Sequence, residues 1–138
     1  MADEQKQPGT KSLKQNEITL ERDGIMRMYY RGPQTAEGIR ALGEKGDEFA
    51  EQLQEKGEPV VIMVDVGELG TFGQPEIQAW RRLMATRDYE RMAIVRLNPA
   101  LQVVMHFLVK MSNRKDKVEA FEDESEAVDW LREATTNR

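Results

Sequence analysis

The sequence of 138 residues has no cysteine and a single histidine, His106. The absence of thiols excludes disulfides, cysteine nucleophiles and cysteine-based metal sites, and it makes the cytoplasm the expected compartment. Because a lone imidazole makes a poor metal site, His106 is interpreted as an exposed helix residue. The sequence therefore predicts neither a metal nor a cofactor.

Long apolar runs are also missing, since none approaches the roughly 18 residues of a membrane span. The polar N-terminus does not resemble a signal peptide, so a soluble intracellular protein is expected. The formal net charge is -5, which argues against general binding of nucleic acid because such binding depends on neutralising phosphates. A chain of this length suits one domain with its own core.

Residues 1–16 are polar, and Leu13 is their only large aliphatic side chain beyond the initiator Met. This segment cannot bury enough surface to offset its ordering entropy, so it is interpreted as a disordered tail before a domain spanning 17–136.

Two alternating segments at the start of that domain, 17–22 and 25–30, predict a β-hairpin. A three-residue loop at 22–24 pairs Leu20 with Met26 and Ile18 with Met28, which matches apolar with apolar and puts Gly24 in a left-handed conformation.

The chain is organised around residues 60–65, Val-Val-Ile-Met-Val-Asp. This run predicts a strand buried on both faces in the middle of a parallel sheet. Strand and helix then alternate to the end. The resulting order, β-β-α-β-α-β-α-β-α, predicts an α/β domain with a mostly parallel sheet and an N-terminal antiparallel hairpin.

The first helix is predicted to begin after Thr35, which can cap it, and to bury a stripe that contains Gly46. Glycine inside a helix costs up to about 1 kcal/mol relative to alanine, so the helix is expected to be kinked or to pack unusually close to its neighbour.

The third helix, 99–112, is apolar around most of its circumference, more than packing against one sheet requires. Val103, Phe107 and Met111 are therefore predicted to bind a partner. Basic residues between 81 and 117 suit an anionic lipid surface or an acidic protein if they gather beside this helix. A set of solvated charges is the simpler interpretation.

The glycines at 67, 70 and 73 invite comparison with phosphate-binding loops, but the Gly-Lys-Ser/Thr ending is missing. Asp65 and Glu68, beyond the carboxyl end of the central strand, are the only pair available for acid-base catalysis. Asp65 is expected to cap the loop instead, and the protein is predicted not to be an enzyme.

Several strings resemble the SpoIIAA-like, STAS-type proteins: the hairpin at 18–32, the central strand at 60–65, Tyr-Glu-Arg-Met-Ala-Ile-Val at 89–95, and Ala-Phe-Glu-Asp followed by Glu-Ala-Val-Asp-Trp-Leu at 120–131. The resemblance covers roughly residues 17–132. It implies a small superhelical βα domain that works by binding.

The resemblance also implies a phosphorylated serine at the start of the helix after the central strand, but residues 73–76 read Gly-Gln-Pro-Glu. Thr71 is the nearest hydroxyl and is the candidate for phosphorylation. A related branch of the superfamily binds apolar ligands or membrane surfaces, and the apolar third helix favours that branch slightly.

Two functions from different classes follow from the sequence. The first is a regulatory interaction module that binds a protein partner, or a second copy of itself, through the loop after the central strand and the third helix. The second is a carrier of an apolar ligand or lipid, or a protein associated with the membrane surface. The predicted binding residues are Gly70, Thr71, Phe72, Gly73, Val103, Phe107 and Met111.

Overall fold

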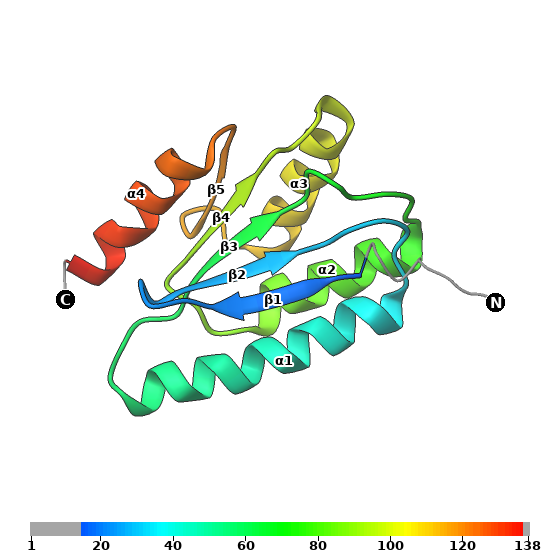
Figure 1. Cartoon of the computed structure of the whole chain (residues 1–138). Coiled ribbons are helices and arrows are strands. Elements are labelled where there is room, and N and C mark those ends of the chain that lie inside the picture. The colour runs from blue at the N-terminus through cyan, green and yellow to red at the C-terminus, as the bar shows by residue number, and fades with distance from the viewer. Residues whose placement is uncertain (1–14, 137–138) are drawn as a thin grey trace.

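The computed structural model describes residues 15–136, which form a five-stranded sheet with helices on both faces (Figure 1). The strands are β1 (Glu17–Leu20), β2 (Ile25–Tyr29), β3 (Val61–Asp65), β4 (Arg91–Val95) and β5 (Val118–Phe121). The helices are α1 (Ala36–Glu55), α2 (Gln74–Thr86), α3 (Pro99–Ser112) and α4 (Glu124–Thr136). The predicted α/β class and order of elements are confirmed. The predicted tail lies almost wholly outside the described residues.

The strands lie side by side in the order in which they occur in the chain, with β1 antiparallel to β2 and the others parallel. Crossovers between parallel strands are right-handed, and β2 to β5 are added in one direction across the sheet. For this reason α1, α2 and α3 all cover the same face. α4 is the last element of the described residues, and it packs on the opposite face against β3, β4 and β5 (Figure 1).

The predicted register of the hairpin is confirmed, because Leu20 pairs with Met26 and Ile18 with Met28. Gly24 has a φ of 80°, as the three-residue loop requires. Pairing apolar with apolar residues therefore identified the correct loop length.

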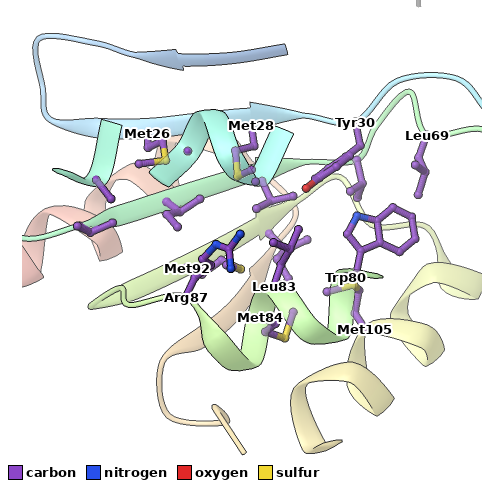
Figure 2. A pocket seen from close by; sticks show the side chains of 18 of the residues that line it. Met26, Met28, Tyr30, Leu69, Trp80, Leu83, Met84, Arg87, Met92 and Met105 are labelled. Atoms are coloured by element: carbon purple, nitrogen blue, oxygen red, sulfur yellow. The ribbon is translucent and has the colours of Figure 1, made fainter. Parts of the chain in front are cut away.

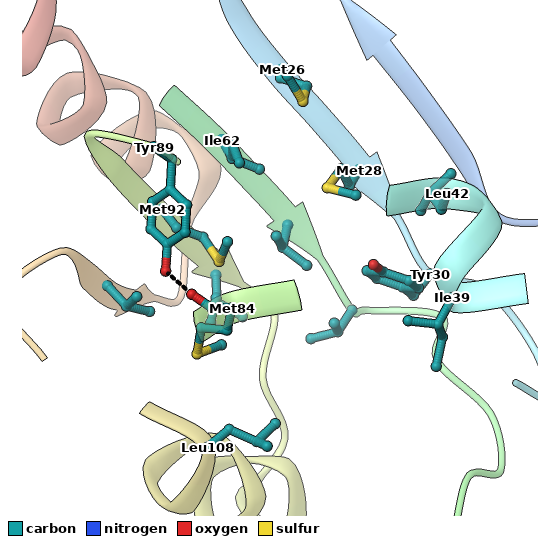
Figure 3. Packing of buried hydrophobic residues seen from close by; sticks show 14 of the residues in the cluster. Met26, Met28, Tyr30, Ile39, Leu42, Ile62, Met84, Tyr89, Met92 and Leu108 are labelled. Carbon is teal, nitrogen blue, oxygen red and sulfur yellow. Dashed lines mark hydrogen bonds between the residues drawn. The ribbon is translucent and has the colours of Figure 1, made fainter. Parts of the chain in front are cut away.

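The core consists of two layers separated by the sheet. The larger layer lies between the sheet and α1 to α3, and Figure 3 shows its side chains converging from β2, β3 and β4. The smaller layer lies under α4 and contains Ile25, Val61, Met63, Ala93, Val95, Ala127 and Leu131. β3 contributes alternate residues to both layers, so the prediction that the central strand is buried on both faces is confirmed.

The helical spacing of Ile77, Trp80, Leu83 and Met84 predicts a second helix from Pro75 to about Asp88. In the structure α2 ends at Thr86. The Tyr89 hydroxyl donates a hydrogen bond to the carbonyl oxygen of Met84 at 3.0 Å (Figure 3). In a longer helix that carbonyl would accept from the N–H of Asp88. A buried tyrosine therefore takes the place of the next helical hydrogen bond, and burial raises its pKa to about 12.

Arg27 projects from β2 on the face that α4 covers, and only 7% of it is exposed. Its guanidinium donates to both carboxylate oxygens of Asp23, at 3.1 and 2.9 Å, and lies 3.9 Å from Glu124. The hydrogen bond from Arg27 is the main reason why the pKa of Asp23 is lowered. The pair ties the hairpin loop to its own second strand.

We expect the Asp23→Asn variant to lose part of the protein's acid sensitivity. Because the pKa of Asp23 is lower in the folded than in the unfolded chain, its stabilising contribution is present above about pH 4 and is lost as the pH falls through the folded value. Urea unfolding at pH 7, 4 and 3 should show a smaller decrease in stability for the variant. Asp129→Asn, on the exposed surface of α4, is the control, and equal slopes for Asp23→Asn and wild type would contradict the expectation.

Candidate functional site

An apolar stripe of Val103, Phe107 and Met111 runs along the outer side of α3. These residues are the exposed large hydrophobic side chains of the described chain, with 72%, 49% and 52% of their surface accessible. The same helix buries Leu101 and Leu108 on its inner side. The i, i+4, i+8 spacing places the three on one line, which we call the α3 stripe.

The orientation of α3 is fixed at both ends. The Asn98 side chain accepts a hydrogen bond from the Leu101 N–H at 2.8 Å, and Pro99 supplies a preset first turn. At the other end Asn113 adopts a left-handed conformation with a φ of 62°. The Arg114 guanidinium donates to the Ala85 carbonyl at the end of α2. The α3 stripe therefore lies at the surface of a helix whose two ends are both fixed by hydrogen bonds.

Several of the basic residues between 81 and 117, for which gathering beside α3 was the alternative to solvated charges, are engaged elsewhere. Arg87 pairs with Asp47, Arg91 pairs with Glu133, and Lys117 donates to the Tyr89 carbonyl. Arg114 also lies over the Tyr89 ring. Lys110 and Lys115 are exposed, and α3 itself contains no acidic residue. The helix that carries the stripe therefore has a basic side chain, Lys110, and no acidic one.

The glycine loop, residues 67–73, is fastened to the connection between β2 and α1. The Gly32 N–H donates to the Glu68 carbonyl at 2.8 Å, and the Gly70 N–H donates to the Gly32 carbonyl at 2.9 Å. A Cβ at Gly70 would lie 2.7 Å from the carbonyl carbon of Gly32. This glycine allows two backbone segments to touch, and no phosphate role is needed to explain it.

The remaining loop residues differ in their surroundings. Thr71 is exposed, whereas the half-buried Phe72 ring packs against Trp80 at a centroid distance of 5.3 Å. Gly73 is the N-cap of α2, and its N–H donates to the Glu76 side chain at 2.6 Å. Phe72 therefore anchors the loop, and Thr71 remains the accessible hydroxyl.

The two acids at the carboxyl end of β3, Asp65 in the strand and Glu68 just after it, pair with arginines. Asp65 accepts from the Gly67 N–H at 2.9 Å, which confirms the predicted cap, and from Arg96 Nε at 3.0 Å. Glu68 lies 3.7 Å from Arg31 Nε. Carboxylates engaged in this way position the loop, and their arrangement gives no support to acid-base catalysis.

His106 lies on the exposed side of α3, as predicted. Within residues 15–136, no three side chains of the types that bind metals come together in an arrangement that could hold an ion.

A cavity of about 90 Å³ lies between the sheet and the three helices α1, α2 and α3 (Figure 2). Leu69 from the glycine loop and Val104 from the inner side of α3 both line it, so the loop and the third helix meet at this cavity. Its wall is mostly apolar, and the polar side chains that line it belong to Tyr30, Trp80, Asp47, Arg87 and Asp88. Five of the eight methionines of the chain contribute to it: Met26, Met28, Met84, Met92 and Met105.

No pattern in the sequence predicted this cavity. The available signals were Gly43 and Gly46 in α1, which both line the cavity, and the unusual number of methionines. Gly43 packs tightly, because a Cβ there would lie 2.6 Å from Leu83 Cδ2. At Gly46 a Cβ would meet its nearest neighbour, Ile18, only at 3.5 Å. The expectation of close packing therefore holds at the first glycine and not at the second.

No helix within residues 15–136 is long and apolar enough to cross a membrane.

Comparison with known proteins shows which family has this architecture. No curated protein matches the chain. The fold is similar to the crystal structure of an uncharacterized protein of the DUF3478 family with a SpoIIAA-like fold from Shewanella loihica PV-4. The TM-score is 0.63 at 20% identity, and the match covers 89% of this chain and 98% of the other. The SpoIIAA-like family model matches residues 25–132. The chain, with its hairpin-edged sheet and four-helix arrangement, belongs to the SpoIIAA-like family of STAS-type domains.

Proposed function

We propose that this protein is a regulatory, non-enzymatic interaction module of the cytoplasm that binds a protein partner through the α3 stripe, with the glycine loop as the neighbouring contact. SpoIIAA-like domains are generally non-enzymatic. The observation that carries the proposal is the exposure of Val103, Phe107 and Met111 on one line of a well-capped helix.

The apolar surface and the residue types of the α3 stripe favour a binding role. Contiguous exposed apolar side chains on a soluble domain commonly mark an interaction surface. Phe107 lies at the centre of the stripe, and aromatic and methionine side chains are enriched at the cores of protein interfaces. The exposed Lys110 and Lys115 favour a partner whose complementary groove has acidic edges.

Replacing Phe107 by glutamate should abolish this association and leave the fold intact, because the side chain is half exposed. The measurement is isolation of tagged protein under gentle conditions, followed by mass spectrometry of the polypeptides that remain bound in stoichiometric amounts. Gln102→Glu introduces the same charge at an exposed position of the same helix outside the stripe and is the control.

A polypeptide retained by wild type and by Gln102→Glu but lost from Phe107→Glu would support the proposal. Retention of the same polypeptide by Phe107→Glu would contradict it. Sedimentation of wild type, but not of Phe107→Glu, with anionic phospholipid vesicles would assign the stripe to a membrane surface instead.

The cavity favours a second function, the carriage of an apolar ligand. A space of about 90 Å³ with apolar walls is unusual in a domain core, where voids larger than a water molecule are few. Native mass spectrometry of the gently purified protein distinguishes the two functions. A monomer with additional small-molecule mass supports the carrier, a bare dimer indicates self-association through the stripe, and a bare monomer that recovers a polypeptide partner supports the interaction module.

A further inference from the structure

The side chains that line the cavity favour one class of apolar molecule over others. The inference drawn from them rests on the second proposed function, the carriage of an apolar ligand. We propose that it binds a compact aromatic molecule, about the size of one benzene ring, held by the methionine side chains from β2, β4, α2 and α3. The size, the charge and the chemistry of the walls each contribute to this conclusion.

The volume excludes long chains. About 90 Å³ corresponds to roughly three times the share of one water molecule in the liquid, which is about 30 Å³. An engineered apolar cavity of about 150 Å³ in another protein binds benzene. The flexible methionine side chains can make up this difference by changing rotamers, since each has three rotatable bonds.

The charged end of the cavity does not favour an ionic head group. Arg87 Nε lies 2.8 Å from a carboxylate oxygen of Asp47, so the one arginine of the lining already has an acidic partner. Asp88 adds a second negative charge at the same end. A carboxylate or phosphate ligand would have to compete with both acids for one guanidinium. A neutral ligand meets no such competition.

The walls favour an aromatic ring over an aliphatic one. Thioether sulfurs make favourable contacts with the edges of aromatic rings, and Figure 2 shows methionines on several sides of the cavity. Tyr30 and Trp80 also line the space and pack edge to face at 5.6 Å (Figure 2). A ligand ring can extend this arrangement, because edge-to-face pairs are the preferred geometry of aromatic groups.

Gly46 on α1 is one of the residues that line the cavity. Its missing side chain leaves Ile18 Cδ1 at 3.5 Å and Met26 Sδ at 3.6 Å from the ideal Cβ position, which are ordinary contact distances. Alanine therefore fits there without strain and places a methyl group at the cavity wall. The Gly46→Ala variant should be folded, and more stable to heat than wild type because alanine favours helix.

The test is nuclear magnetic resonance of the full chain labelled with ¹³C at the methionine methyl groups, titrated with benzene, cyclohexane and sodium decanoate. Benzene should shift the signals of Met26, Met28, Met84, Met92 and Met105. Met63, under α4, and Met111, on the α3 stripe, are internal controls that should not move. Gly46→Ala should weaken benzene binding at least about fourfold, the equivalent of one buried methylene.

The results of the titrations distinguish binding of an aromatic ligand from the more general carriage of an apolar ligand. Tighter binding of benzene than of cyclohexane, with no response to decanoate, supports it. Equal binding of benzene and cyclohexane, or preferential binding of decanoate, overturns the aromatic class and leaves an apolar carrier standing. No shift with any of the three compounds overturns both, as does a response confined to Met111.

Discussion

Replacing Leu108 by alanine should lower the free energy of unfolding by about 2–5 kcal/mol. Leu108 is fully buried in the larger core layer, at the inner side of α3 (Figure 3). Truncation removes its apolar surface from the core and leaves a hole that the rigid sheet cannot fill. Because small domains are stable by only about 5–15 kcal/mol, this change is a substantial part of the total.

The adjacent residue provides the matched comparison. Phe107→Ala removes a larger side chain, but half of that side chain already faces solvent, so the expected loss is about 1 kcal/mol. Urea denaturation monitored by circular dichroism measures both. If the Phe107 variant proved the less stable of the two, the stripe would belong to the core, and its proposed role in binding would fail.

Gly70→Ala should destabilise the protein by about 1–3 kcal/mol, which is the usual cost of forcing extra atoms into a packed site. The added Cβ would lie 2.7 Å from the carbonyl carbon of Gly32 and 2.9 Å from the nitrogen of Pro33. Both are backbone atoms, so relief requires the two connections to move apart. That movement would weaken the hydrogen bond from the Gly70 N–H to the Gly32 carbonyl.

Gly73→Ala is the control from the same loop. A Cβ at Gly73 would meet its nearest neighbour, a Glu76 carboxylate oxygen, at an ordinary distance of 3.5 Å. Its loss of stability in the same denaturation measurement should therefore be a fraction of that for Gly70. Amide exchange of Gly32 and Gly70 should accelerate only in the Gly70 variant. Similar values for both variants would mean that the loop adapts freely and that the contact with Gly32 is unimportant.

Much of the fold was predictable because the spacing of apolar residues along the sequence indicates which side chains are buried. The alternation in residues 17–30 identified the hairpin register, and the apolar run at 60–65 identified the middle strand. The bounds of α3 agree with the prediction. The end of α2 was wrong by two residues because the hydroxyl of Tyr89 competes with the helix for one carbonyl, and such a contact has no periodic signature.

The candidate site also has one part that the sequence predicted, the α3 stripe, and one part that it did not, the cavity. An excess of apolar residues around a helix is visible in the sequence, and so Val103, Phe107 and Met111 were predicted to be contacts and are exposed. The cavity was not predictable, because a void results from small mismatches among side chains of six elements, β2, β3, β4, α1, α2 and α3. The two helix glycines illustrate this limit, since a Cβ at Gly43 would clash with Leu83 of α2 whereas a Cβ at Gly46, one turn later, would make only ordinary contacts.

The position of α4 has a consequence for synthesis on the ribosome. All strands pair with their neighbours in sequence, so the sheet can assemble progressively as the chain emerges. Its second face, with Val61, Met63 and Val95, stays uncovered until Glu124–Thr136 has left the exit tunnel. A nascent or truncated chain lacking α4 would present this apolar face to other chains and would be a substrate for chaperones, even though most of its sheet is already complete.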